Sequence, residues 1–179
     1  MNQMKKGILS LITWTLPFIL LAQNDTSHGI NWIEGLTWEQ VKQKAKTENK
    51  CIFLDCYATW CGPCKLMDKN VYPDGQVGNI INAQFVSVRV QMDKTDHDNE
   101  QAKIWYNAAQ QLSREYGIGG YPSFLFFNSS GKLLHKAIGA RNVSDFKALV
   151  KDALTDPEEK YETLVKKNEE RAIRVFSYA

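Results

Sequence analysis

The spacing of apolar residues changes several times along the chain, and four segments have the spacing of β-strands. Residues 51–57 are nearly all apolar, as expected for a strand that is covered on both faces in a parallel sheet. Residues 85–90 alternate apolar and polar side chains, which also indicates a strand. Residues 122–128 and 132–138 predict a β-hairpin, because a turn sequence, Asn-Ser-Ser-Gly, separates the two runs.

Segments with helical spacing lie between the predicted strands. Thr37 and Gln40 have the spacing of a capping box, and the helix that they begin is expected to end near Asn49. Residues 73–75 predict a turn, which a short helical piece over residues 77–81 follows. The other predicted helices cover residues 61–71, 100–116 and 145–154, with Ser144 as the cap of the last one.

The order of these elements predicts an α/β fold. Helices alternate with strands in the first half of the chain, which implies parallel pairing, and the late hairpin adds an antiparallel edge. We therefore expect a central mixed sheet of four or five strands, flanked by helices on both faces. A fifth strand would be a short first one around residues 30–33.

Residues 1–22 have the features of a secretory signal peptide. Lys5 and Lys6 form a positively charged start, an apolar stretch follows to Leu21, and Ala22 offers a small residue for cleavage. The alternative is an uncleaved membrane anchor, but the apolar stretch has about 14 residues, whereas roughly 20 span a bilayer. We expect export to the bacterial periplasm, a flexible lead-in or short first strand over residues 23–35, one domain over 36–153 and a charged helical extension over 154–179.

The charge balance argues against a nucleic-acid-binding surface. The chain has 22 basic and 20 acidic residues, and removal of Lys5 and Lys6 with the signal peptide leaves 20 of each. Nucleic-acid binding would need a clustered excess of positive charge. The composition is otherwise that of a globular domain, with 44% hydrophobic and 23% charged residues.

The four cysteines fall into two pairs with different expected roles. Cys51 and Cys56 lie on one predicted strand, about 16 Å apart and on opposite faces, so they cannot form a disulfide with each other. We expect both to act as small buried apolar residues. Cys61 and Cys64 stand at the start of a predicted helix, where unpaired backbone N–H groups favour a thiolate. Their spacing alone leaves three interpretations open: a redox dithiol, a structural disulfide and half of a zinc site.

Other residues around this dithiol resemble the thioredoxin superfamily. Asp55 lies six residues before the first cysteine of Trp60-Cys-Gly-Pro-Cys-Lys65, at the end of an apolar strand. Gly120-Tyr121-Pro122-Ser123 opens another strand, and Gly139 follows the last strand of the hairpin. These features are similar to the motifs of the family, in the same order, over residues 36–153.

The resemblance implies a thioredoxin fold with redox chemistry. Residues 64–74 are also similar to an exported branch, which includes the C-terminal periplasmic domain of the thiol:disulfide interchange reductase. By this resemblance Cys61 is the nucleophile and Cys64 resolves the mixed disulfide, so that the redox group is the Cys61–Cys64 disulfide, with no other cofactor and no metal. Asp55 would be buried, with a raised pKa, and would relay a proton to or from Cys64. Arg89 stands where the family typically carries a lysine, and next to Asp55 it would hold the carboxylate ionised and weaken the relay.

Five residues are expected to contact the client protein. The resemblance implies a cis-proline at Pro122, which faces the sulfurs and offers backbone to an extended substrate, while Trp60 shields the dithiol. His28, His97 and His135 have no ligand spacing and are expected to be exposed. The expected substrate-binding residues are Trp60, Gly62, Pro63, Tyr121 and Pro122.

The leading hypothesis is an exported thiol-disulfide oxidoreductase that is biased towards reduction. Gly62-Pro63 resembles reductases, whereas oxidases and isomerases of this fold usually carry a histidine before the second cysteine. One alternative is a dedicated electron relay from a membrane reductase to a single client pathway. Another is a non-enzymatic binding module, in which the dithiol only holds the start of the helix together. The expected partners are disulfide-containing clients and an upstream thiol reductant, with no nucleic acid and no membrane contact beyond the signal segment. We expect a monomer.

Overall fold

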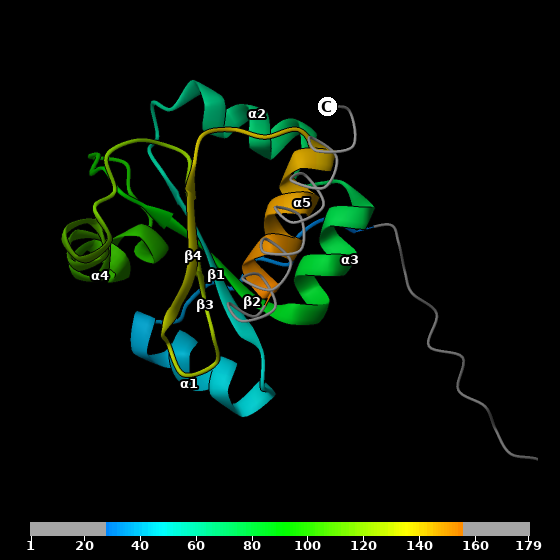
Figure 1. Cartoon of the computed structure of the whole chain (residues 1–179). Coiled ribbons are helices and arrows are strands. Elements are labelled where there is room, and N and C mark those ends of the chain that lie inside the picture. The colour runs from blue at the N-terminus through cyan, green and yellow to red at the C-terminus, as the bar shows by residue number, and fades with distance from the viewer. Residues whose placement is uncertain (1–27, 156–179) are drawn as a thin grey trace, which may run out of the picture.

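The computed structural model describes residues 28–155, which form five helices and four strands (Figure 1). The predicted signal peptide and residues 156–179 of the predicted extension lie outside the described residues. Within residues 28–155, no helix is both long enough and apolar enough to cross a membrane. In chain order the elements are α1 (Trp38–Glu48), β1 (Cys51–Tyr57), α2 (Gly62–Asn70), α3 (Gly75–Gln84), β2 (Phe85–Gln91), α4 (Glu100–Tyr116), β3 (Ser123–Phe127), β4 (Leu133–Ile138) and α5 (Val143–Leu154).

The four strands form one mixed sheet in the order β2-β1-β3-β4. β1 pairs in parallel with β2 and antiparallel with β3, and β3 pairs antiparallel with β4. This topology confirms the predicted mixed α/β sheet and its antiparallel edge. The optional fifth strand is reduced to a single parallel bridge between Trp32 and Ser87.

Residues 29–33, which we call the strap, run beside β2 and are held to the domain by backbone hydrogen bonds. The N–H of Ile30 donates to the carbonyl of Tyr72 at 2.9 Å. The N–H of Ile33 donates to the carbonyl of Ser87 on β2 at 2.8 Å. The strap is therefore neither a free lead-in nor a full strand.

Two hydrophobic cores fill the two faces of the sheet. α1 and α4 cover one face, as Figure 1 shows, and bury side chains such as Leu54 and Trp105. α2, α3 and α5 cover the other face, where Phe53 and Phe146 lie in a group of phenylalanine rings. Successive residues of β1 alternate between the two cores, because neighbouring side chains of a strand point to opposite faces.

The two cysteines of β1 follow the same alternation. Cys51 packs against the core under α3 and α5, and Cys56 belongs to the core under α1 and α4. Both are free, which confirms that they do not pair with each other. Cys56 is fully buried, whereas Cys51 is only half-buried, so the prediction of burial holds fully for Cys56 alone.

Side-chain caps determine where the first and last helices begin. The Thr37 side chain accepts a hydrogen bond from the N–H of Gln40, and the Gln40 side chain accepts one from the N–H of Thr37, which confirms the capping box. The prediction that Ser144 caps the last helix is wrong. Asn142 caps it instead, because its side-chain oxygen accepts a hydrogen bond from the N–H of Asp145 at 2.8 Å.

The helix after the predicted turn is longer than expected. α3 has 10 residues, where only a short helical piece was predicted. Its cap is Asp74, whose carboxylate accepts hydrogen bonds from the N–H groups of Gln76 and Val77 at 2.9 and 3.0 Å. A capping acid inside the predicted turn therefore starts the helix directly after that turn.

Candidate active site

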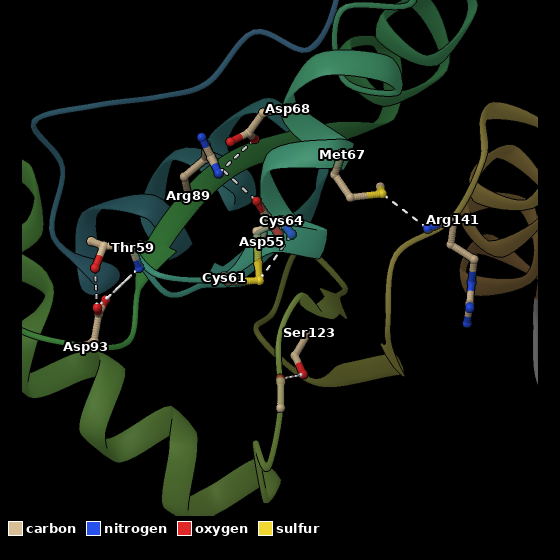
Figure 2. Close-up of a disulfide and its surroundings, with 11 residues drawn as sticks. Asp55, Thr59, Cys61, Cys64, Met67, Asp68, Arg89, Asp93, Ser123 and Arg141 are labelled. Carbon is tan, nitrogen blue, oxygen red and sulfur yellow. Dashed lines mark hydrogen bonds and ion pairs between the residues drawn. A yellow bond between two sulfur atoms is a disulfide. The ribbon is translucent and has the colours of Figure 1, made fainter.

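Cys61 and Cys64 form a disulfide at the first turn of α2 (Figure 2). Cys61 is the N-cap residue, and its sulfur accepts a hydrogen bond from the N–H of Cys64 at 3.1 Å. Pro63 lies in this first turn, where its missing N–H leaves no helical hydrogen bond unmade. The backbone donor and the positive end of the helix both favour negative charge on the Cys61 sulfur. Of the two sulfurs, that of Cys61 is therefore the better stabilised thiolate after reduction.

Aromatic rings from two segments lie beside the disulfide. The rings of Trp60 and Tyr121 meet edge to face, with their centroids 5.8 Å apart. Trp60 is 71% exposed, whereas each cysteine of the disulfide is only 2% exposed, so the indole offers an apolar surface to solvent rather than packing in a core. The Tyr121–Pro122 peptide bond is cis. The Ser123 hydroxyl donates to the carbonyl of Gly120 at 2.7 Å and closes this turn.

Asp55 is a buried carboxyl group that is paired with an arginine. Only 1% of Asp55 is exposed, and its register partner on β2 is Arg89, so both side chains leave the sheet on the same face. The Nε–H of Arg89 donates to Oδ2 of Asp55 at 3.2 Å, and Nη2 of Arg89 lies 2.9 Å from Oδ1 of Asp68 on α2. Figure 2 shows the guanidinium group between these two carboxylates.

Burial outweighs the arginine in its effect on Asp55. Removal from water raises the pKa of Asp55 to about 6, although the charge of Arg89 acts to lower that pKa. Arg89 thus approaches Asp55, as the sequence suggested, without returning this pKa to the usual range. A carboxyl group that titrates near pH 6 can accept and release a proton close to neutral pH.

The segment between β2 and α4 is attached to the loop that carries the dithiol. The carboxylate of Asp93 accepts hydrogen bonds from the N–H of Thr59, at 3.1 Å, and from the Thr59 hydroxyl. Asp98 is buried and accepts hydrogen bonds from Nε2 of Gln91 at 2.8 Å and from the hydroxyl of Tyr106 at 2.6 Å. Across residues 28–155 there is no group of three or more His, Cys, Asp or Glu side chains that could hold a metal ion.

Sequence reasoning did not identify several residues of the site. Asp68 lies four residues after Cys64 and so on the same face of α2, a spacing that could have indicated it. The sulfur of Met67 accepts a hydrogen bond from the N–H of Arg141 at 3.2 Å. This contact joins distant segments, so no local sequence pattern indicates it. His135 is half-buried on β4, so its predicted exposure is wrong.

Comparisons with known proteins identify a family and several relatives. The family described as Thioredoxin-like domain matches residues 38–154. The thiol:disulfide interchange protein DsbD of Colwellia psychrerythraea is 34% identical over 115 residues, which cover 63% of this chain and 17% of that protein. The chain spans less than a fifth of the length of the DsbD proteins that it matches.

Two solved structures are also similar. A proposed disulphide-isomerase from Bacteroides thetaiotaomicron is 30% identical and has a TM-score of 0.57, over 73% of this chain and 98% of that one. The DsbH oxidoreductase is 20% identical, with a TM-score of 0.58 over 83% of this chain and 94% of that one, and its similarity concerns the fold alone. Together these similarities confirm the fold that the sequence predicted.

The raised pKa of Asp55 predicts a pH-dependent effect of the Asp55→Asn substitution on stability. The native pKa of about 6 exceeds the ordinary value of 3.8, so the native state binds this proton more tightly than the unfolded state does. Wild-type stability should therefore fall as pH rises from about 4 through 6, and the variant should escape this loss. Relative to wild type, the free energy of unfolding of the variant should rise by on the order of 3 kcal/mol between pH 4 and pH 8.

Urea unfolding at several pH values measures this difference. Asp96→Asn, at an exposed carboxyl in the loop after β2, is the matched control for the loss of one negative charge. A stability difference between the two variants that stays constant from pH 4 to pH 8 would contradict the raised pKa.

Proposed function

The chain belongs to the Thioredoxin-like domain family, and we propose that it is an exported thiol-disulfide oxidoreductase that reduces disulfide bonds of client proteins. The observation that carries this proposal is the Cys61–Cys64 disulfide, whose first sulfur caps α2 and accepts the N–H of Cys64. This contact favours one sulfur of the reduced pair as a thiolate, which is the reactive form in thiol-disulfide exchange.

The proposed reaction is a two-step exchange. The Cys61 thiolate attacks one sulfur of a client disulfide, which forms a mixed disulfide and releases the other client sulfur as a thiolate. Cys64 then loses its proton and attacks the Cys61 sulfur, which breaks the mixed disulfide and releases the second client thiolate. The client gains two electrons and, after protonation, two thiols. The Cys61–Cys64 disulfide that remains must be reduced again by an upstream dithiol.

Asp55 is proposed to accept the proton that Cys64 loses in the second step. Its burial on the strand that leads to the dithiol, and its pKa of about 6, support this role. An ionised carboxylate at neutral pH can take the proton, and the protonated form is stabilised by the low polarity around it. The proton would return to solvent after the client has left.

The client is proposed to bind over the exposed side of the dithiol. Trp60 offers an apolar ring with 71% exposure, and Tyr121 meets it edge to face. Gly62 and Pro63 are also exposed beside the cysteines, and the cis Pro122 lies directly before β3. An extended client segment could thus place its disulfide at Cys61 between an apolar surface and strand backbone.

The direction of electron flow is proposed to be reductive. Gly62 and Pro63 carry no charge between the cysteines, so no cation within the motif adds to the stabilisation that the helix and the N–H of Cys64 give the Cys61 thiolate. A weakly stabilised thiolate gives a dithiol that loses its electrons readily.

The proposed location is the periplasm, and the proposed electron source is a membrane reductase. The signal-like residues 1–22 support export. The similarity to the thiol:disulfide interchange protein DsbD supports a second candidate, in which the chain relays electrons from such a reductase to one client pathway. A broad reductase acts on many disulfides, whereas a relay needs one tight partner.

Cysteine variants test the exchange reaction. Cys61→Ser should reduce insulin no faster than background, because no attacking thiolate is left. Cys64→Ala should accumulate mixed disulfides through Cys61, which can be identified by mass spectrometry after non-reducing gels. Cys51→Ser is the control, since Cys51 is a free cysteine of β1, and this variant should keep its activity.

The outcomes of this experiment separate the candidates. Slow insulin reduction by wild type together with one dominant captured partner supports the relay. If the Cys61→Ser variant keeps its full biological function, the binding module is the only one of the three hypotheses that remains.

The reduction potential tests the reductive direction. Wild type is expected near the value of thioredoxin, about −270 mV, and far from the strong oxidant DsbA at about −120 mV. Pro63→His should raise the potential, because a cationic ring beside Cys61 stabilises the thiolate and so the reduced form. Equilibration with glutathione buffers measures both values, and Pro63→Ala controls for the loss of the proline ring. A wild-type potential close to that of DsbA is incompatible with the proposed direction.

Expression of the whole chain in a bacterium tests the proposed location. The mature protein should appear in the periplasmic fraction with a mass that lacks residues 1–22, and a chain made without these residues should remain in the cytoplasm. Recovery of the full-length mass in the membrane fraction would instead identify residues 1–22 as an anchor.

A further inference from the structure

Arg89 is enclosed by three aromatic rings in addition to its two carboxylate partners. The guanidinium carbon lies 4.3 Å from the ring centroid of Tyr57, 5.8 Å from that of Trp32 and 5.9 Å from that of Tyr72. Cation–π attraction adds to the ion pairs, so the arginine is held on several sides. These rings come from β1, from the strap and from the residues after α2.

Trp32 reaches Arg89 because the strap is closely fitted to the domain. A Cβ atom at Gly29 would lie only 2.1 Å from the carbonyl oxygen of Tyr72, so only glycine allows this approach. The N–H of Asn31 donates to the side chain of Asn82 at 2.8 Å, and the Asn82 amide donates back to the carbonyl of Gly29 at 3.0 Å. These contacts fix the position of the indole over the guanidinium.

Trp32 and Arg89 lie together at the surface, and Arg89 contacts the buried Asp55. Two surface hollows, of about 380 and 220 Å³, reach this region, and both residues line both of them. Asp68 lines the larger hollow and Tyr57 the smaller one. The side chain of Arg89 is 29% exposed and that of Asp55 only 1%. The arginine therefore lies between the buried carboxyl group and solvent.

We propose that Trp32 and Arg89 are positioning residues for Asp55. The strap holds the indole over the guanidinium and so keeps water from the buried carboxyl, while the ion pairs with Asp55 and Asp68 keep the cation in place. This inference rests on the proposed function, in which Asp55 accepts the proton of Cys64. It makes the strap, which precedes every helix of the domain, a part of the redox site.

The groups that face Asp55 determine the sign of each expected change. Arg89 on β2 favours the ionised carboxyl, whereas burial and the negative charge of Asp68 on α2 favour the protonated one. Removal of the cation should therefore raise the pKa of Asp55, and admission of water should lower it. The remaining neighbours are Cys56 and Tyr57 on β1, Tyr72 after α2, and Phe124, the register partner on β3.

The experiment is a pH titration of the Asp55 carboxyl carbon by NMR in the oxidised protein. Arg89→Met should move the midpoint up by about one pH unit, and Trp32→Ala should move it down by about one unit, each a tenfold change in proton affinity. Trp32→Phe should leave it near the wild-type value, because a smaller ring still covers the guanidinium. The pH dependence of mixed-disulfide resolution should shift in the same directions.

Two further variants keep the test decisive. Trp38→Ala is the matched control, since Trp38 packs with Trp105 and Phe127 on the other face of the sheet, and it should lower stability without moving the midpoint. If Trp32→Ala does not fold, Trp32→Leu should still lower the midpoint, because the smaller side chain leaves part of the guanidinium uncovered and admits water.

The readouts separate this inference from the proposed function. An unchanged midpoint in folded Trp32→Ala, or in folded Trp32→Leu where Trp32→Ala does not fold, overturns the positioning role. Midpoints that move as expected in a protein that reduces no disulfide support the positioning role and overturn the function.

Discussion

The burial of Asp55 is the constraint on which the arrangement of the site depends. A carboxyl group in the interior is costly unless charge or hydrogen bonds compensate it. The parallel register of β1 and β2 supplies Arg89 directly opposite, and the long guanidinium side chain reaches Asp68 on α2 as well. Because Cys61 is the N-cap of α2, the same helix carries the dithiol at its first turn and, one turn later, Asp68, which shares Arg89 with the buried acid. The position of the strand acid and that of the reactive sulfur are therefore not independent.

Much of this arrangement could be predicted from the sequence, because it follows from local patterns. The apolar run 51–57 and the capping box at Thr37 each specify their element within a few residues, and both agree with the structure. The dithiol could be placed at a helix start for the same reason. Asn142 is not distinguished as the cap by residue type, because Ser144 is an equally good capping residue two positions later.

The parts that could not be predicted depend on contacts between distant segments. Nothing near Trp32 in the sequence indicates that it lies over Arg89, more than fifty positions further along the chain. The pKa of Asp55 also depends on the tertiary structure. The residue types indicate an ion pair with Arg89, which lowers this pKa, but the depth of burial determines that desolvation raises it by more. The attachment of Asp93 to Thr59 likewise joins two loops that no periodicity relates.

The strap also has a consequence for the sheet as a whole. β2 and β4 are the edge strands, and an edge strand presents free N–H and C=O groups to which another chain can add. On β4 the exposed Lys136 places a charge along the edge. On β2 the strap occupies the edge itself, since Ile33 bonds the carbonyl of Ser87 and Trp32 bridges to the same residue. The segment that covers the arginine therefore also ends the sheet, and a chain that lost it would expose a strand edge open to aggregation.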